Sequence, residues 1–270
     1  MPLPHPPPTV AASGGLRWSR VAGGIVIVTA LCVAGAVLVR PTDVGPGAAP
    51  AAVPVVSAAV APVAEALPAG EAAAGAAATV ESVSVVVAPD AGWVEATAAR
   101  TGIPVRALEA YARADLVIDA EQPGCGIGWN TIAGIAAIES DHGRHGGAVL
   151  GADGYSTPTI RGAALDGRGV AAIPDTDGGA WDGDAVWDRA VGPLQFIPAT
   201  WSTWGADGNG DGAADPNQID DAALAAARYL CASGEMTTVG GWRTAVFSYN
   251  HLDVYVDDVA RVAQQYGASG

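Results

Sequence analysis

The stretch NTIAGIAAIESDHG, residues 130–143, decides the fold of this chain. Its apolar residues recur at the spacing of one helix face, at Ile132, Ile135 and Ala136. This pattern predicts a helix that begins near Asn130, a residue suited to an N-cap. Glu139 lies on the same face, so we expect its carboxyl on the apolar side of the helix. Burial there would raise the pKa of the carboxyl, as a general acid at neutral pH requires; the alternative is a frayed, solvated helix end.

A mainly helical domain is expected around this stretch, over residues 89–268. Pro104 is placed to start a helix, because proline is favoured in the first turn. Helical spacing of apolar residues predicts further helices at residues 93–100, 105–114, 198–204, 219–232, 242–249 and 253–266. Residues 144–190 are rich in glycine and aspartate, so we expect a long irregular loop insertion there, with at most a short hairpin.

The sequence before residue 89 is expected to lie outside this domain. Residues 1–20 are rich in proline and are predicted to be a cytoplasmic tail. Residues 21–39 carry no charge and, as a helix, are long enough to cross a bilayer core of about 30 Å. Arginines are concentrated before this segment, so the positive-inside rule predicts a single-pass transmembrane anchor in the cell membrane with the C-terminal domain outside. Residues 40–88 are predicted to be a disordered linker rich in alanine, proline and valine.

Cleavage of the apolar segment is the alternative to an anchor. Small residues at 34–36 offer a site for a signal peptidase, and a cleaved signal peptide would give a secreted protein. In both cases the helical domain is expected to be extracytoplasmic.

The balance of charges excludes nucleic acid as a partner. The chain has 13 basic and 28 acidic residues, which gives a formal net charge of −15. Proteins bind nucleic acids mainly through lysine and arginine at the phosphates, and this chain is strongly depleted in such residues. We therefore expect no nucleic-acid surface.

The domain contains an even pair of cysteines, Cys125 and Cys231. Outside the cell membrane such a pair is expected to form a disulfide. The bond would tie the segment before the Glu139 helix to the end of the helix at 219–232. Two buried thiols are the alternative.

The segment DGNGDGAAD, residues 207–215, follows the ligand order of an EF-hand calcium loop. Ligand positions one, three and five are occupied by Asp207, Asn209 and Asp211, and a glycine follows at position six. Ala213 would supply the backbone carbonyl of position seven. Gln218 replaces the glutamate that is usual at position twelve, which weakens a strict EF-hand assignment. An Asx-turn loop without metal is the alternative.

Three other groups of residues each allow two interpretations. The acidic segment 175–188 is expected to be a solvated loop, with a second catalytic carboxylate or a cation site as the alternative. His142 and His145 lack the acidic or sulfur partners of a zinc site, so we expect them at the surface. Tryptophans near residues 191–198 could either stack on sugar rings or pack in the core: Trp181, Trp187, Trp201 and Trp204.

Three short motifs occur in order along the domain. They are GIAAIESDHG at 134–143, VGPLQFIP at 191–198 and SYN at 248–250. Their combination resembles the membrane-bound lytic murein transglycosylase B family of the lysozyme-like superfamily. The resemblance implies a lysozyme-like transglycosylase domain that acts on peptidoglycan glycan strands. It implies cleavage of the β-1,4 bond between N-acetylmuramic acid and N-acetylglucosamine, which leaves 1,6-anhydro ends.

The same resemblance implies roles for individual residues. Glu139 corresponds to the single catalytic glutamate, which acts as acid and then as base. Gln195 is expected to line the glycan groove. Tyr249 and Asn250 are expected to contact the sugar and to steady the glutamate, and Ser140 is grouped with these substrate-binding residues. Residues 144–190 depart from the family pattern and receive no such assignment.

The family also places the acid that closes its calcium loop three residues beyond position twelve, where this chain has Asp221. We therefore expect a structural Ca²⁺ and no organic cofactor. The predicted ligands are Asp207, Asn209, Asp211, Ala213 and Asp221. Two other functions stay open: a lysozyme-type muramidase that uses Glu139 with water, and a non-catalytic glycan-binding module of the cell wall.

Overall fold

The computed structural model describes residues 88–270. The predicted cytoplasmic tail, membrane-spanning segment and linker lie outside the described residues. Within the described part of the chain, no helix is long and apolar enough to cross a membrane. The fold described below is therefore that of the C-terminal domain.

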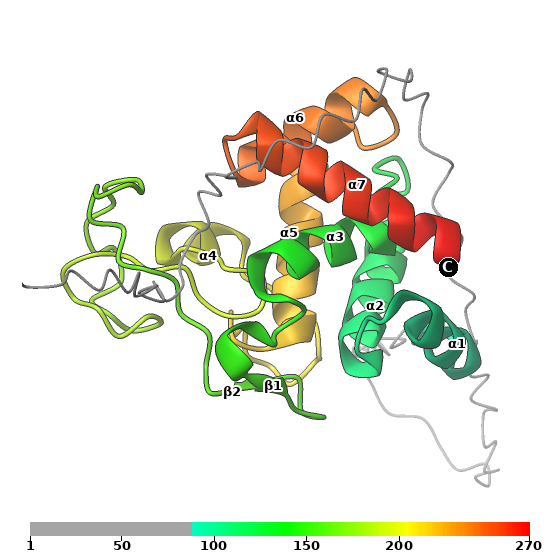
Figure 1. Cartoon of the computed structure of the whole chain (residues 1–270), viewed down its shortest axis with the longest axis horizontal. Helices are drawn as coiled ribbons and strands as arrows, with labels where there is room; N and C mark the ends of the chain where they lie inside the picture. The colour runs from blue at the N-terminus through cyan, green and yellow to red at the C-terminus, as the bar shows by residue number, and fades with distance from the viewer. Residues whose placement is uncertain (1–87) are drawn as a thin grey trace, which may run out of the picture.

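Helices dominate this domain, as predicted. In chain order they are α1 (Ala91–Thr101), α2 (Val105–Glu121), α3 (Trp129–Ser140), α4 (Pro198–Trp204), α5 (Ile219–Ser233), α6 (Val239–Tyr249) and α7 (Asp253–Ser269). A 3₁₀ turn (His145–Gly147) and two short strands, β1 (Val149–Leu150) and β2 (Ser156–Thr157), follow α3. Helix α2 runs further than predicted because its buried face continues through Leu116 and Ile118. Figure 1 shows the helices gathered together and the long loops between β2 and α4 extending to one side.

Helix α3 lies among α2, α5 and α7 and packs against all three. Its apolar face, predicted from the sequence, is fully buried at Ile132, Ile135 and Ala136. Gly134 allows the close approach of α7, because a Cβ there would lie 3.2 Å from the carbonyl oxygen of Val259. Burial on three sides fixes the direction of α3, and this direction determines where Glu139 points.

The N-terminus of α3 differs from the prediction in one detail. The helix begins at Trp129 after Gly128, and Asn130 is not its N-cap. The side chain of Asp115 on α2 accepts a hydrogen bond from the Trp129 amide instead, at 3.0 Å. Asn130 uses its amide to donate to the Ala263 carbonyl of α7, also at 3.0 Å. A side chain from α2 therefore caps α3, rather than the neighbouring residue that the sequence predicted. Spacing along the chain does not reveal a cap from another helix.

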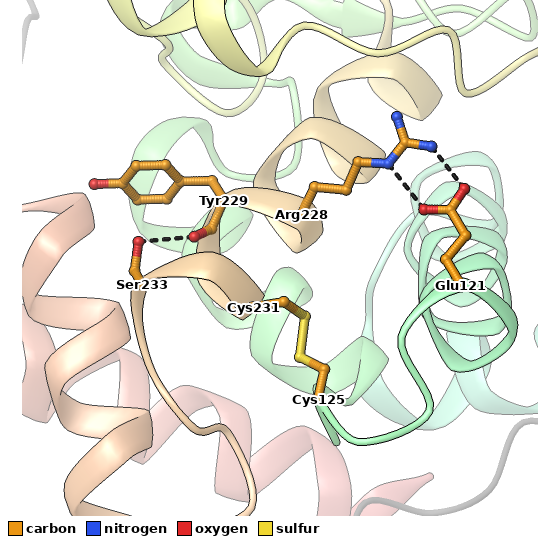
Figure 2. The surroundings of a disulfide bond; sticks show 6 residues. All are labelled: Glu121, Cys125, Arg228, Tyr229, Cys231 and Ser233. Atoms are coloured by element: carbon orange, nitrogen blue, oxygen red, sulfur yellow. Dashed lines mark hydrogen bonds and ion pairs between the residues drawn. A yellow bond between two sulfur atoms is a disulfide. The ribbon is translucent and has the colours of Figure 1, made fainter.

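A disulfide between Cys125 and Cys231 is present, as the even pair predicted. It joins the segment before α3 to α5 across a sequence separation of 106 residues. Figure 2 shows Arg228 of α5 beside it, donating to both carboxylate oxygens of Glu121 at 3.0 and 2.7 Å. The disulfide thus connects α5 with the segment between α2 and α3. The ion pair connects α5 with the end of α2.

The segment between α3 and α4 is irregular, as expected, and its one hairpin pairs β1 with β2 in antiparallel register. The prediction of a solvated acidic loop was wrong for two of its carboxylates, because Asp182 and Asp188 are 7% and 0% exposed. Asp188 accepts hydrogen bonds from the amide and hydroxyl of Thr176, at 2.8 and 2.7 Å. Asp182 accepts from the Arg189 amide at 2.6 Å. These aspartates act as internal acceptors that hold the loop together, because buried backbone amides need partners.

A buried polar network attaches this loop region to the helices. Arg106 of α2 pairs with Asp220 in the first turn of α5 and also donates to the Ala152 carbonyl at 3.1 Å. Gln218 caps α5 by accepting from the amides of Asp220 and Asp221, at 2.6 and 3.0 Å. Gln218, which stands where an EF-hand loop usually has a glutamate, therefore serves as the cap of α5.

Candidate active site

Glu139 lies in the last turn of α3 and is partly buried. The hydroxyl of Tyr255 on α7 donates to its Oε1 at 2.6 Å. Burial raises the pKa of Glu139 to about 7, and the hydrogen bond from Tyr255 opposes that rise. A carboxyl with this pKa can both donate and accept a proton near neutral pH. Glu139 is therefore not part of a frayed, solvated helix end, which was the alternative to a buried carboxyl.

Tyr255 is the residue of this site that the sequence did not reveal. Its spacing with Val259 and Ala263 placed it on the apolar face of α7, and it is indeed buried there. Burial and the nearby charge of Glu139 raise the pKa of Tyr255 well above its ordinary value, so its hydroxyl stays protonated and can donate. A tyrosine among aliphatic residues on a buried face was the available signal, because a buried phenol needs a hydrogen-bond partner.

The chain leaves α3 in an unusual turn. Asp141, His142 and Gly143 have φ angles of 51°, 57° and 81°, three left-handed residues in succession. Ser140, predicted to bind substrate, is buried, and its hydroxyl donates to the Pro193 carbonyl at 2.5 Å and accepts from the Gly143 amide at 2.8 Å. Both hydrogen bonds hold the turn, and the predicted contact of Ser140 with the substrate stays a prediction.

His142 is also placed differently from the prediction. We expected a surface residue, but the side chain is 2% exposed. Its Nδ1 lies 3.2 Å from the hydroxyl of Tyr111 on α2, and its Nε2 lies 3.0 Å from the hydroxyl of Tyr266 on α7. His145 is exposed, as expected. The spacing of the two histidines gave no indication that only one faces the core.

Gln195 belongs to a tight turn in which Val191 and Phe196 exchange backbone hydrogen bonds of 2.8 and 3.1 Å. It has φ 52°, and its side-chain amide donates to the Gly192 carbonyl at 2.8 Å. Left-handed backbone is uncommon for a residue with a Cβ and needs support from its surroundings. Gly192 contributes to that support by letting the turn pack closely against the Pro216 carbonyl. A Cβ at this position would clash with that carbonyl. The turn holds the partly exposed Gln195 side chain in a defined place.

Tyr249 connects the second motif to the third. Its hydroxyl donates to the Leu194 carbonyl at 2.7 Å, directly before Gln195. Tyr249 also packs edge-on against Phe196, with ring centroids 5.8 Å apart. We expected Tyr249 and Asn250 to steady the glutamate, but the hydrogen bond to Glu139 comes from Tyr255. Asn250 is the partly exposed C-cap of α6 and stays a predicted sugar contact.

The tryptophans near the second motif divide between the two expected roles. Trp201 is buried in the core against Phe196, with ring centroids 5.3 Å apart. Trp204 is partly exposed and packs edge-on against Tyr229 at 5.6 Å, and Tyr229 in turn contacts Tyr249. Trp181 and Trp187 are partly exposed. Three of the four therefore keep part of their surface available for a ligand.

The predicted calcium loop lies against the start of α5, where its side chains accept hydrogen bonds from backbone amides. Asp207 accepts from the amides of Gly210 and Gly212 at 2.7 and 2.8 Å, a local turn that folds the loop on itself. Asp221, buried on α5, accepts from the amides of Gly208 and Asp215 at 2.8 and 2.9 Å. Burial raises the pKa of Asp221, and the surrounding amides oppose the rise. The predicted calcium ligands Asp207, Asn209, Asp211, Ala213 and Asp221 stay a prediction, because the close group of carboxylate oxygens in the described residues lies at Asp175, Asp177 and Asp188 instead.

A second acidic group lies in the 175–188 segment. One carboxylate oxygen from each of Asp175, Asp177 and Asp188 falls within 4.8 Å of the others. Backbone amides already bind these side chains: Asp175 accepts from Gly178 at 2.9 Å, and Asp177 accepts from Trp181 at 2.7 Å. The aspartates of this segment therefore serve its internal structure.

Comparison with protein families agrees with this geometry. The family model for the transglycosylase SLT domain matches residues 105–264, from α2 to α7, and the chain therefore belongs to this family within the lysozyme-like superfamily. Membership implies lytic transglycosylase activity on peptidoglycan. Comparisons with curated proteins and with solved structures gave no match.

Proposed function

We propose that this member of the SLT transglycosylase family is of the lytic murein transglycosylase B type. It cleaves the β-1,4 bond between N-acetylmuramic acid and N-acetylglucosamine and leaves 1,6-anhydro ends. The observation that carries the proposal is the state of Glu139: a partly buried carboxyl, with its pKa raised to about 7, bound by a tyrosine from another helix. A single group of this kind can serve as acid and base in turn.

In the first step, the protonated Glu139 carboxyl gives its proton to the glycosidic oxygen. The bond from the muramic acid C1 to that oxygen breaks, and the N-acetylglucosamine end leaves with a free hydroxyl. In the second step, the Glu139 carboxylate removes the proton from the C6 hydroxyl of the muramic acid, and the C6 oxygen bonds to C1. Glu139 is again protonated, and no water has been consumed.

The neighbours of Glu139 support this cycle in different ways. Tyr255 donates to Oε1, so it stabilises the carboxylate formed after the first step. Gln195 and Asn250 are partly exposed polar side chains, suited to contact sugar hydroxyls. Tyr249 acts mainly by joining the Gln195 turn to α6. We assign substrate binding to Gln195, Tyr249 and Asn250 on the basis of the motifs and of these positions.

Hydrolysis by a muramidase mechanism is the alternative with the same glutamate. Glycosidases that use water commonly pair two carboxylates about 5–10 Å apart across the scissile bond. The aspartates of the 175–188 segment, the candidates for a second carboxylate, are bound by their own loop's amides. This favours the single-carboxylate scheme. A non-catalytic glycan-binding module would not need the raised pKa of Glu139.

We also propose that Ca²⁺ binds the loop at 207–215 and Asp221. Oxygen atoms of Asp207, Asn209, Asp211 and Asp221, with the carbonyl of Ala213, would hold it. Such an ion would offset the negative charge of the loop's carboxylates and brace the start of α5, which Gln218 and Arg106 also hold. Its contribution would be to stability.

The domain is further proposed to act outside the cell membrane. It would be tethered there by a single-pass anchor at 21–39, or secreted after that segment is cleaved. The Cys125–Cys231 disulfide supports this placement, because disulfides persist mainly in oxidising compartments.

The product ends test the proposed reaction. Purified peptidoglycan is digested with the protein, and the released fragments are analysed by mass spectrometry. We expect fragments ending in 1,6-anhydro-muramic acid, one water lighter than hydrolysed fragments. Free reducing ends would show that water trapped the reaction and would favour the muramidase. Absence of released fragments, with a folded protein, would leave only the glycan-binding module.

A further inference from the structure

We propose that His142 is a positioning residue for Glu139: held between Tyr111 and Tyr266, it fixes the turn that ends α3 and thereby the glutamate three residues before it. This inference rests on the proposed function, because it concerns the same catalytic carboxyl. It assigns a role to a buried titratable group that the reaction does not use directly.

The backbone after Glu139 needs an anchor. Asp141 and His142 both have positive φ angles, 51° and 57°, and Gly143 follows with 81°. Residues with a Cβ rarely adopt this conformation, and they keep it only where the surrounding structure holds them. Glu139 lies two residues before Asp141, so any relaxation of the turn moves the last residues of α3.

Side-chain contacts identify His142 as the anchor on the helical side of the turn. The Asp141 side chain is exposed and pairs at 2.8 Å with Arg144 at the surface, where ion pairs contribute little. Gly143 has no side chain. His142 is 2% exposed, and its two ring nitrogens contact hydroxyls on two different helices, α2 and α7. Both of these helices pack against α3.

The hydrogen bonds determine which protonation state of His142 serves this role. Tyr111 is 0% exposed, and within residues 88–270 its hydroxyl has no second hydrogen-bond partner. A buried O–H without an acceptor is costly, so Tyr111 must donate to Nδ1. The ring proton then sits on Nε2 and donates to the Tyr266 oxygen. Only the neutral imidazole satisfies both contacts.

The electrostatic surroundings favour the same neutral form. Burial lowers the pKa of His142 to about 4, with the nearby charge of Arg144 acting in the same direction and Asp141 opposing it. The titratable groups that face the ring are Tyr111 from α2, Tyr266 from α7, and Asp141 and Arg144 from the turn itself. The imidazole therefore stays neutral across the neutral pH range.

The other side of the turn is held by the loop region. Ser140 donates to the Pro193 carbonyl at 2.5 Å, and Ser156 donates to the Gly143 carbonyl at 2.7 Å. His142 thus connects the turn itself to α7, the helix that also carries Tyr255. Loss of His142 should let the Glu139 carboxyl shift relative to the Tyr255 hydroxyl. A misplacement of about 1 Å at a reacting group can cost roughly 10²-fold in rate.

The experiment compares four variants of the full chain on solubilised glycan strands. His142→Phe keeps a ring but removes both hydrogen bonds, and His142→Gln restores a donor and an acceptor. Tyr111→Phe and Tyr266→Phe each remove one contact. The readouts are kcat, KM, the pH dependence of kcat and the melting temperature. A merely structural role would lower the active fraction without moving the titration of Glu139.

We expect His142→Phe to lose roughly 10²-fold in kcat with KM nearly unchanged. Because the Glu139 carboxyl would move away from the Tyr255 hydroxyl, whose hydrogen bond lowers its pKa, the pH limb that reports Glu139, near 7 in the wild type, should move to higher pH. His142→Gln should recover most of the rate. Wild-type kcat and pH profile in folded His142→Phe would overturn the proposal.

Two further outcomes distinguish a failure of the positioning role of His142 from a failure of the proposed function. An inactive wild type would contradict the function itself. Activity that depends on Glu139 but not on His142 would contradict only the positioning role. If His142→Phe does not fold, Tyr111→Phe and Tyr266→Phe decide the matter: reduced kcat with a displaced pH limb supports the role, and an unchanged profile overturns it.

Discussion

The helices and the loop region at 144–218 are held together by different forces, although both contribute to one site. The helices bury continuous apolar faces, such as Ile132 and Ile135 of α3, and carry the disulfide. The buried side chains of the loop region include Asp182 and Asp188, which accept hydrogen bonds from nearby groups of the loop. Apolar burial is not directional, whereas these contacts depend on the geometry of individual hydrogen bonds.

The two regions meet at the active site. Glu139 and Tyr255 come from the helices, whereas Gln195 comes from the loops, and Tyr249 bridges them through the Leu194 carbonyl. The acid and base chemistry is thus placed on helices, whereas the residues predicted to bind the substrate come from both regions: Gln195 from the loops, and Tyr249 and Asn250 from the end of α6. A substitution in either region should therefore also change the activity of the shared site.

Removing the disulfide should give the largest effect on stability. The double variant Cys125→Ser with Cys231→Ser opens a loop of 106 residues. Chain-entropy arguments give about 4.7 kcal/mol for a loop of roughly 100 residues, with measured losses typically about 2–5 kcal/mol. Denaturant unfolding checks the value.

Reductant provides the control for this measurement. It should destabilise the wild type by a similar amount and leave the double variant unchanged. If the double variant and the wild type unfold at the same denaturant concentration, the bond does not hold the helices as we describe.

Calcium should act on the loop region. At about 100 times its dissociation constant, Ca²⁺ that binds only the folded state stabilises by roughly 2.7 kcal/mol. Chelator should lower the melting temperature, and Asp211→Ala should remove this response. Asp119→Ala, an exposed carboxylate on α2, is the matched control and should keep the response. Identical melting curves of the wild type with calcium and with chelator would contradict the site.

The pH dependence of stability tests the helical region. The pKa of His142 is lowered from 6.5 to about 4, so this group contributes stability that is lost as pH falls below 6.5. The pKa of Asp115 is raised from 3.8 to about 7, so its contribution is lost as pH rises toward 7. Between pH 4 and 6.5 the two slopes, each at most about 1.4 kcal/mol per pH unit, oppose each other.

Asp115→Asn should separate these contributions. The amide oxygen can still accept from Trp129, but the titration of Asp115 is gone, while that of Glu139, whose pKa is also raised to about 7, stays. Stability of this variant should fall more steeply than that of the wild type as pH drops from 6.5 to 4. A parallel pH dependence in both proteins would show that Asp115 does not titrate as described.

Tyr255→Phe should have the smallest effect, on catalysis. It removes the hydroxyl that donates to Glu139 and keeps the ring that packs in the core. We expect about a tenfold loss in kcat, the order of one hydrogen bond to a charged group. Because the bond lowers the pKa of Glu139, the basic limb of the pH–rate profile should move to higher pH. A shift to lower pH would contradict this assignment.

Sequence reasoning recovered the helical region well and the loop region poorly, for a physical reason. Periodic apolar residues report helices directly, so α3 and the placement of Glu139 followed from spacing and motif. The Tyr255 contact depends on how closely α7 approaches Gly134, a matter of three-dimensional packing. The burial of His142 depends on a left-handed turn with no periodic signal. Asp182 accepts a hydrogen bond from an amide seven residues away. Composition alone predicts a solvated side chain for such a residue.

The central claim is that Glu139 is the group that donates and recovers the proton. Glu139→Gln has nearly the same shape and can still accept the Tyr255 hydrogen bond, but it cannot transfer a proton. General acid–base groups commonly contribute about 10²–10⁴-fold, and here one group serves both steps. Fragment release from purified peptidoglycan is measured for both proteins, with circular dichroism to show that each is folded.

We predict that folded Glu139→Gln releases fragments at least about 10³-fold more slowly than the wild type while still binding the glycan. Release at the wild-type rate by the folded variant would contradict the account.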